Sequence, residues 1–200
     1  MTDYRRELNL DSAMAGVTYR ANGVTYQREV FASYPDQVIV LRFTADRPGR
    51  IGFTLKMDSP HTNSQTKAVA LNTLALTGQV ESGGLRFESR VRVINAGGRV
   101  STNENAITVE NADSVTVLLS AATSFKNFQD ISASPGQRCA GVMSRVKQRT
   151  YDALLAAHLS DFRELFRRVK LGLGQTSRAA LPTDERLKEV KKLGLEGDPA

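Results

Sequence analysis

The chain has 200 residues, 40% of them hydrophobic, which is enough to build the core of one domain or of two small ones. Its net charge is +6, but 27 basic residues stand against 21 acidic ones along the chain, and this mixture favours a solvated surface over a nucleic-acid interface. The lack of Trp and the single cysteine, Cys139, exclude a tryptophan sugar platform, an internal disulfide and a multi-cysteine metal site.

The sequence carries no targeting or spanning signal. The first residues, MTDYRREL, lack the apolar core of a secretory signal, and no apolar run approaches the length that spans a membrane. The densest basic run, residues 163–170, has the pattern of an amphipathic helix, whose charged face is more simply explained as solvated. We therefore expect no membrane and no nucleic acid among the partners.

From Tyr4 to about Ser124, short runs of alternating bulky and polar residues are separated by turn residues. Runs of this length, enriched in β-branched and aromatic residues, predict an antiparallel β-sandwich or barrel rather than alternating strands and helices. Asn22-Gly23 supplies the positive φ of a tight hairpin, and residues 95–98 form a looser turn. Examples of these predicted strands are residues 17–19, 24–31, 38–43, 51–57, 73–79, 85–94, 107–110 and 114–120.

Two details of the strand region bear on packing. Residues 38–43 are apolar on both faces over most of their length, which predicts a central strand covered on both sides. Arg5, Arg6 and Glu7, and later Arg28-Glu29, place charges inside strand-like runs. Such charges persist when they are paired or face another surface, so we expect structural ion pairs or, as the alternative, a contact with a partner domain.

The pattern changes to helical spacing near Ser134-Pro135-Gly136. Two helices are predicted after this point, each with a stripe of apolar side chains along one face. Because short helices are marginal alone, both stripes need a packing partner. A third helix is predicted from Leu181-Pro182-Thr183, with Thr183 as the N-cap and Gly194 as the stop. The first two stripes are Cys139, Val142, Met143 and Val146, and then Tyr151, Leu155, His158, Phe162, Leu165 and Val169.

A search for catalytic motifs gives little. The sequence contains no Gly-x-Ser-x-Gly elbow, no His-Glu-x-x-His and no phosphate-binding Gly-x-x-x-x-Gly-Lys-Ser/Thr loop. His61, in the loop DSPHTN, is the candidate substrate contact, although a plain surface histidine is the simpler interpretation. His158 and Cys139 lie on apolar stripes and are interpreted as buried packing residues. The aspartates at turns, Asp36, Asp46 and Asp113, are interpreted as backbone-bonding residues rather than acid–base pairs.

A set of motifs occurs in a fixed order along nearly the whole chain: YRRELNLDSA, VTY, GVTYQREVFASYPDQV, MDSPH, VLLSAATSF, the helical pattern of residues 151–169, and LPTDERL. Together they resemble glycoside hydrolase family 95, a family best known for α-L-fucosidases. Related phosphorylases and hydrolases share a similar β-supersandwich, so single strand motifs are less specific than the ordered set.

The resemblance implies a mainly β chain: an antiparallel β-supersandwich at residues 1–134, a helical linker packing on it at residues 135–174, and at residues 175–200 a linker with the start of an (α/α)6 catalytic barrel. An opening strand or two is expected to precede residue 1. The barrel, which lies outside this chain, would carry the residues of an inverting hydrolysis. We therefore expect no catalytic residue, metal or cofactor here.

By the same resemblance, the partners are the (α/α)6 catalytic domain of the same enzyme and the fucosylated glycan that the full-length enzyme hydrolyses, in the periplasm or outside the cell. The alternative is a free-standing carbohydrate-binding β-sandwich that would use Tyr19, Tyr26 or Tyr34 together with loop amides. A nucleic-acid-binding function would rest on net charge alone.

Overall fold

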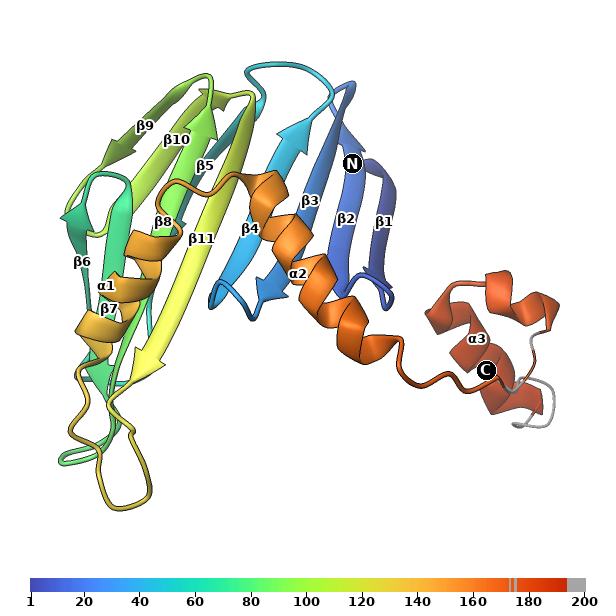
Figure 1. The fold of residues 1–200 in the computed structure, drawn as a ribbon. Helices are drawn as coiled ribbons and strands as arrows, with labels where there is room; N and C mark the ends of the chain where they lie inside the picture. The colour runs from blue at the N-terminus through green and yellow to red at the C-terminus, as the bar shows by residue number, and fades with distance from the viewer. Residues whose placement is uncertain (173, 175, 194–200) are drawn as a thin grey trace. The chain divides into compact units, whose positions relative to one another are not determined.

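The computed structural model describes residues 1–172, 174 and 176–193 and divides the chain into two compact units, the second beginning at Phe166 (Figure 1). All strands and the first two helices begin in the first unit. The last part of the predicted segment 175–200, including the predicted stop at Gly194, lies outside the described residues.

The described residues form eleven strands, all in antiparallel pairs. The predicted mainly β, antiparallel sandwich is confirmed. Their bounds are β1 Thr2–Asn9, β2 Met14–Ala21, β3 Val24–Ser33, β4 Val38–Ala45, β5 Ile51–Lys56, β6 Gln65–Ala70, β7 Thr73–Gln79, β8 Arg86–Ala96, β9 Arg99–Thr102, β10 Ala106–Ala112 and β11 Ser114–Thr123.

The strands form two sheets of unequal size. Eight strands make the large sheet in the order β1-β2-β3-β4-β11-β8-β7-β6, and three make the small sheet in the order β5-β10-β9. Strands of the small sheet contact β7, β8 and β4, so they lie over one part of the large sheet. The core between the sheets consists of Ile51, Leu74, Val91, Val93, Ile107, Val109, Ala112, Val115 and Val117.

Two helices cover the other face of the large sheet, which we call the outer face (Figure 1). Helix α1, Pro135–Arg145, starts at the N-cap Ser134, whose Oγ accepts a hydrogen bond from the Gln137 amide. Helix α2 is Tyr151–Phe166. A second core lies beneath them and consists of Phe31, Val38, Val40, Leu118, Met143, Val146 and Leu154. The sandwich therefore has three layers: small sheet, large sheet and helices.

The predicted helical stripes mostly find their partner in this layer. Cys139, Met143 and Val146 are buried against the sheet, as are His158 and Leu154 of α2, the last of which the stripe did not include. The stripe is wrong at its end: Leu165 is 58% exposed, and Val169, 81% exposed, lies beyond the helix. The aliphatic spacing continues past Leu165, the last residue of the first compact unit.

Turn and strand predictions are confirmed at particular positions. Asn22 and Gly23 have φ of 51° and 73°, the positive values that a tight hairpin between β2 and β3 requires. Strand β4 lies between β3 and β11 and is covered on both faces, with Val40 fully buried under the helices. Arg5 and Glu7 form an exposed ion pair of 2.6 Å on β1, which is the structural pairing expected of charges in this run.

Strands β6 and β9 were not predicted. Both lie at an edge of their sheet, and β6, with the sequence QTKAVA, is almost entirely exposed. An edge strand pairs on one side and packs on little, so its sequence carries no strong alternation of apolar and polar residues.

The second unit contains a 3-10 turn, Ser177–Ala180, and helix α3, Thr183–Leu193. The predicted third helix is confirmed, but Thr183 is its first residue and not its N-cap, because the Arg186 amide already bonds the Pro182 carbonyl. Asp184 and Glu185 lie in its first turn, where the helix dipole favours acids. Inside this unit an ion pair of 3.2 Å joins Arg178 to Glu189.

Candidate functional site

Several loops gather at the end of the sandwich where β5, β7 and β11 finish. Loop 57–64 follows β5 and carries His61, whose ring lies 5.4 Å from the ring of Phe87 at the start of β8. The His61 amide donates to Ser59 Oγ, and Thr66 Oγ1 donates to the Met57 carbonyl, so the loop is held from both sides. His61 is half-buried rather than freely exposed. Its imidazole can meet a ligand only at this loop-covered end of the sandwich.

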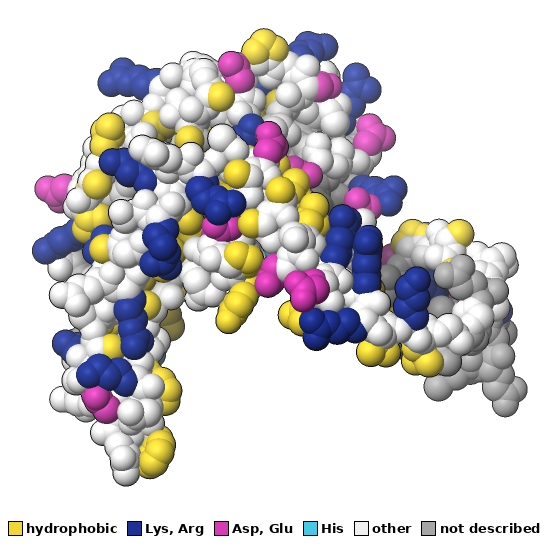
Figure 2. Space-filling model, viewed as in Figure 1, with side chains coloured by type: hydrophobic (Ala, Val, Ile, Leu, Met, Phe, Trp, Pro, Cys, Tyr) yellow, Lys and Arg dark blue, Asp and Glu magenta, His cyan; other side chains and the backbone are white. Residues whose placement is uncertain are grey.

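The loop between β11 and α1 lies at the same end, because Thr123 pairs with Phe87 and the Arg86 amide donates to Ser124 Oγ. Figure 2 shows hydrophobic side chains at the tip of the projection that this loop forms in Figure 1. Phe128 is 88% exposed and Phe125 is 47% exposed. This feature was not predicted, although two aromatic side chains in a polar loop were a sequence signal for it.

The tip of that loop is ordered by its own hydrogen bonds. Lys126 Nζ donates to Asp130 at 3.0 Å and to Ser132 Oγ at 2.9 Å, while the Ser132 amide donates to Asp130 at 2.8 Å. The hydrogen bonds from Ser132, with the help of Lys126, lower the pKa of Asp130 to about 2. Arg138 of α1 donates to the carbonyls of Thr123 and Phe125. The exposed Phe128 is thus held on an organised turn, which suits contact with another surface.

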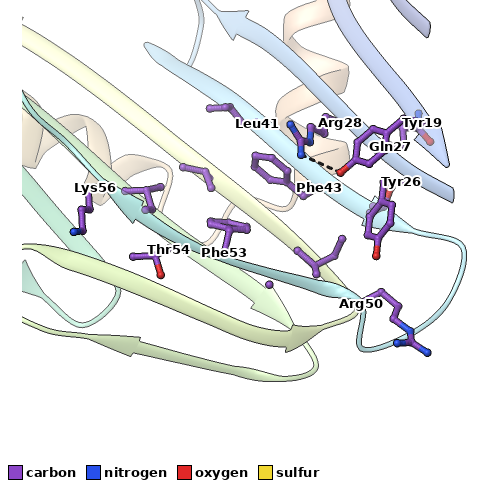
Figure 3. A pocket seen from close by; sticks show the side chains of 15 residues that line it. Tyr19, Tyr26, Gln27, Arg28, Leu41, Phe43, Arg50, Phe53, Thr54 and Lys56 are labelled. Carbon is purple, nitrogen blue, oxygen red and sulfur yellow. Dashed lines mark hydrogen bonds between the residues drawn. The ribbon is translucent and has the colours of Figure 1, made fainter. Parts of the chain in front are cut away.

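A groove of about 390 Å³ opens where β5 faces the inner side of β2, β3 and β4 (Figure 3). Tyr19 and Tyr26 stack with ring centroids 5.2 Å apart, and Arg28 donates a hydrogen bond of 3.0 Å to the Tyr19 hydroxyl. Phe43 and Phe53 meet at 5.1 Å across the groove. These residues come from four strands, and only their register brings them together.

The groove is a poor sugar platform, because its ring faces are already in use. Each of the two tyrosine rings covers one face of the other, and the Arg28 guanidinium lies 5.2 Å above the Tyr19 ring. Tyr34 is 75% exposed, but it lies on the β3–β4 turn rather than among the residues that line the groove. The charged side chains lining the groove are Arg28, Arg50 and Lys56, all basic.

The other candidate residues have structural partners. His158 is buried, with its Nε2 2.8 Å from the Ser12 carbonyl, which it reaches as the N–H donor. Cys139 is fully buried, its Sγ donating to the Glu88 carbonyl, and burial raises the pKa of its thiol. Both were predicted to be packing residues, and their positions fit that role. Neither side chain reaches the loop cluster around His61 or the groove.

The three turn aspartates bind the backbone or a neighbouring side chain. Asp36 is buried and accepts from Ser33 Oγ at 2.7 Å, and Arg149 forms an ion pair with it at 3.1 Å. Hydrogen bonding from the Thr25 backbone lowers the pKa of Asp46. Asp113 accepts from the Gly49 amide at 2.8 Å. Local bonding of this kind is what aspartates at turns provide, and it leaves no facing pair among these three for acid–base chemistry.

Within residues 1–172, 174 and 176–193, no three His, Cys, Asp or Glu side chains come together in a way that would hold a metal ion. No helix in the described part of the chain has both the length and the apolar character to cross a bilayer.

Comparison with known proteins identifies the sandwich. Residues 1–128 match the family model described as "Glycosyl hydrolase family 65, N-terminal domain". This chain belongs to that family of N-terminal domains. Residues 150–200 match a second model, "Glycosyl hydrolase family 95 catalytic domain", so the family 65-type domain is followed, after residues 129–149, by a family 95-type segment.

Named relatives agree with the second match. The chain is 34% identical over 221 aligned residues to α-L-fucosidase 2 of Arabidopsis thaliana and 27% identical over 208 to a protein named as α-fucosidase A of Aspergillus niger. These alignments cover 94% and 96% of this chain, but it spans only 26% of either relative. The predicted resemblance to family 95 is confirmed, and the chain corresponds to about a quarter of such proteins.

The fold of the family 65-type domain also recurs in a solved structure. A protein described as a kojibiose phosphorylase from the human microbiome superposes with a TM-score of 0.58 at 13% identity, over 83% of this chain and 25% of that one. This likeness concerns the fold alone. It is consistent with the expectation that phosphorylases and hydrolases share the sandwich.

Proposed function

We propose that this chain is the N-terminal, non-catalytic part of a longer glycoside hydrolase that removes terminal α-L-fucosyl residues, and that it braces an (α/α)6 catalytic domain. One observation carries the proposal: a sandwich-type match at residues 1–128 is followed in the same chain by a catalytic-domain match from residue 150. The fucosidase names of the two relatives supply the substrate class.

Helix α2 explains how such a brace would work. By sequence it falls inside the catalytic-domain match, yet it packs on the outer face of the sandwich. Tyr151 bonds Glu29 of β3, His158 bonds Ser12 in the β1–β2 turn, and Arg163 bonds Asp11 in the same turn. Because α2 is anchored at both ends, the sandwich fixes where the following polypeptide starts. The catalytic segment thus begins from a rigid base.

The proposed role of His61 is a contact with the fucosylated substrate at the loop end of the sandwich. Its position supports this in one respect: it shares that end with the organised loop that presents Phe128. A single half-buried histidine cannot perform hydrolysis, which needs two positioned carboxyl groups. The proposed contribution is therefore to binding and not to the bond-breaking step.

The test compares two proteins on 4-nitrophenyl α-L-fucoside: the 200-residue chain and the full-length polypeptide that contains it. We expect 4-nitrophenol release from the full-length protein and none above the buffer rate from the chain. Release by the chain itself that is lost when one of its carboxylates is substituted would overturn the non-catalytic assignment. A full-length protein that leaves 4-nitrophenyl α-L-fucoside intact but hydrolyses a different aryl glycoside would overturn the fucosyl assignment. Saccharide titration of the chain tests the binding-module alternative, for which we expect no heat of binding.

A further inference from the structure

A cavity of about 580 Å³ opens on the outer face of the large sheet, beside α1. Arg90 and Arg92 of β8 line it. They project from the outer face because the residues that alternate with them, Val91 and Val93, are buried between the two sheets. The second half of α1 and the turn between β6 and β7 complete the lining. The volume is within the range of sites that hold a small organic ligand.

This cavity is separate from the loop end and the groove described above. His61 contacts Phe87 at the start of β8, whereas Arg92 lies further along the same strand, about 17 Å from Phe87 at the usual rise of a strand. The groove of Figure 3 opens on the inner side of the large sheet, and the cavity opens on its outer face. A ligand in the cavity would therefore meet neither His61 nor the groove.

The charge of the cavity is positive. Arg90, Arg92 and Lys147 line it, and none of its lining residues is acidic. Arg90 donates through Nε to Glu88, so one of the three charges is partly neutralised. The half-buried side chain of Arg92, in contrast, has no hydrogen bond or ion pair with another described residue. A guanidinium that has lost part of its water without gaining a carboxylate is stabilised when an anion binds beside it.

The helix side of the cavity adds to this preference. Lys147 follows the last turn of α1, where a cation offsets the negative end of the helix dipole. Figure 2 shows several Lys and Arg side chains over α1 and the strands beside it. Ser144 lies on the exposed side of the cavity and offers a hydroxyl that both donates and accepts hydrogen bonds.

The turn between β6 and β7 contributes a fixed acceptor. The Asn72 amide donates to Thr102 Oγ1 at 3.2 Å, and the Asn72 carbonyl accepts from the Val93 amide at 2.9 Å, so the backbone is held on both sides. The side-chain Oδ1 of Asn72 is buried and accepts no hydrogen bond from the described residues. Because a buried carbonyl oxygen without a donor is unfavourable, a ligand hydroxyl at this point would stabilise it.

Together these groups define a class of ligand. An inorganic anion would pair with Arg92 but would fill little of the cavity, and it would give Asn72 no donor. A neutral sugar would supply hydroxyl donors but would leave Arg92 without a negative partner. The apolar side chains of Ile94 and Met143, which also line the cavity, suit the C–H face of a sugar ring.

We propose that this cavity binds a sugar that carries a carboxylate or phosphate group. Arg92 and Lys147 contact its anionic oxygens, and Asn72 accepts a hydrogen bond from one of its hydroxyls. A sugar acid and a sugar phosphate share this chemistry, and the experiment distinguishes them. Because the site uses residues of this chain only and breaks no bond, the inference goes beyond the proposed function and does not rest on it.

The test is chemical modification of arginine in the full-length protein, which reports on Arg92 whether or not sugars bind elsewhere. Phenylglyoxal modifies accessible guanidinium groups, and peptide mass spectrometry gives the rate at Arg92 and at Arg99, an exposed arginine of β9 outside the cavity. The probes are glucuronate, glucose 6-phosphate, inorganic phosphate and neutral methyl glucoside. We expect at least one sugar anion at about 10 mM to slow modification of Arg92 about tenfold, as a dissociation constant of about 1 mM would, without slowing that of Arg99.

Each outcome has a definite meaning. Protection of Arg92 by glucuronate alone would identify a carboxylate ligand, and protection by glucose 6-phosphate alone would identify a phosphate ester. The inference is overturned if neither sugar anion protects Arg92, or if Arg99 is protected equally. It is also overturned if methyl glucoside or inorganic phosphate protects Arg92 as strongly as the better sugar anion, because then either the charge or the sugar ring contributes nothing.

Two substitutions in the full-length protein test the cavity from opposite sides. Arg92→Gln removes the unpaired cation from β8, and Ser144→Glu adds a carboxylate on the exposed side of α1. Each should weaken calorimetric binding of the better probe about tenfold or more, whereas Arg99→Gln should leave it unchanged. Melting temperatures show whether the variants are folded, and Ser144→Glu decides the question if Arg92→Gln does not fold. Wild-type affinity in folded Ser144→Glu would contradict the inference.

Discussion

The hydroxyl of Tyr151, the first residue of α2, donates a hydrogen bond of 2.8 Å to the carboxylate of Glu29 on β3, 122 residues earlier in the chain. The Arg42 guanidinium lies 5.2 Å above the Tyr151 ring, and Phe31 meets the ring edge-on at 5.9 Å. One side chain thus joins the helix to two neighbouring strands. It fixes the point on the sandwich where the segment matching a catalytic domain begins.

Removing this hydroxyl should weaken the chain in a pH-dependent way. Tyr151→Phe leaves Glu29 without its donor and should lower the free energy of unfolding by about 1–2 kcal/mol at pH 7. Burial, and then the bond to Glu29, raise the pKa of Tyr151 above its usual value. The neutral phenol is therefore favoured by folding, so its contribution is complete below about pH 10 and is lost as pH rises further.

Urea denaturation of wild type and Tyr151→Phe from pH 7 to pH 11 tests both parts. Above pH 10 the free energy of unfolding of the wild type should fall more steeply than that of Tyr151→Phe, so the two values should converge. If the two free energies of unfolding differ by the same amount at every pH, deprotonation of Tyr151 does not destabilise the folded chain.

His158 should be needed for stability rather than for chemistry. Its ring stacks on Phe31 at 4.9 Å and its Nε2 donates to the Ser12 carbonyl, so His158→Ala leaves a cavity and an unpaired carbonyl. We expect a loss of about 2–4 kcal/mol in the free energy of unfolding. His158→Gln, which keeps a donor, should cost less, and Ala156→Ser on the exposed side of α2 should cost almost nothing. A His158→Ala protein as stable as the Ala156→Ser control would rule out the anchoring role.

Alanine substitutions at two glycines can distinguish the cost of backbone strain from the cost of steric overlap. Both Gly23 and Gly98 have positive φ, at 73° and 59°, but a Cβ on Gly23 would meet nothing within 4 Å. A Cβ on Gly98 would overlap the Glu110 carbonyl oxygen and lie 2.5 Å from the Ala112 nitrogen. Gly23→Ala should therefore cost about 1 kcal/mol and Gly98→Ala clearly more, about 3 kcal/mol or above. Thermal denaturation ranks the two, and the reverse order would contradict the close approach of the β8–β9 turn to the end of β10.

The turn that presents Phe128 should loosen in strong acid. The pKa of Asp130 is lowered from 3.8 to about 2, chiefly by hydrogen bonds from Ser132, so the turn keeps this contribution above pH 4 and loses it as pH falls towards 2. The side-chain carboxyl signal of Asp130, followed by NMR, should titrate near pH 2. In Ser132→Ala the midpoint should move upward. A wild-type midpoint near 4 would mean that the turn is not organised as described.

The proposed substrate contact of His61 can be tested in the full-length enzyme. His61→Ala should remove one hydrogen bond to the glycan and raise KM about fivefold with kcat unchanged, in line with about 1 kcal/mol for such a bond. Thr62→Ala, in the same loop and exposed, serves as the control. If His61→Ala lowers the melting temperature but leaves KM unchanged, its contact with Phe87 is purely structural.

Much of the architecture is local in origin and was predictable. The Asn22-Gly23 hairpin follows from the positive φ that these residues tolerate, and strand β4 follows from residues that are apolar on both faces. Helix α1 follows from the helical spacing of Cys139 and Met143 after Ser134-Pro135-Gly136. The resemblance to family 95 likewise rests on ordered sequence motifs. The predicted boundaries at residues 134 and 174 stay a prediction.

The tertiary structure alone decided how these elements combine. Nothing local divides eleven strands into sheets of eight and three, and nothing local links Tyr151 to Glu29 or His158 to Ser12. The sequence shows which side chains share a strand face, because that depends on a period of two residues. It does not show which face is left uncovered, because that depends on pairing between distant segments. The groove beside β5 therefore became visible only when the strands were placed in register.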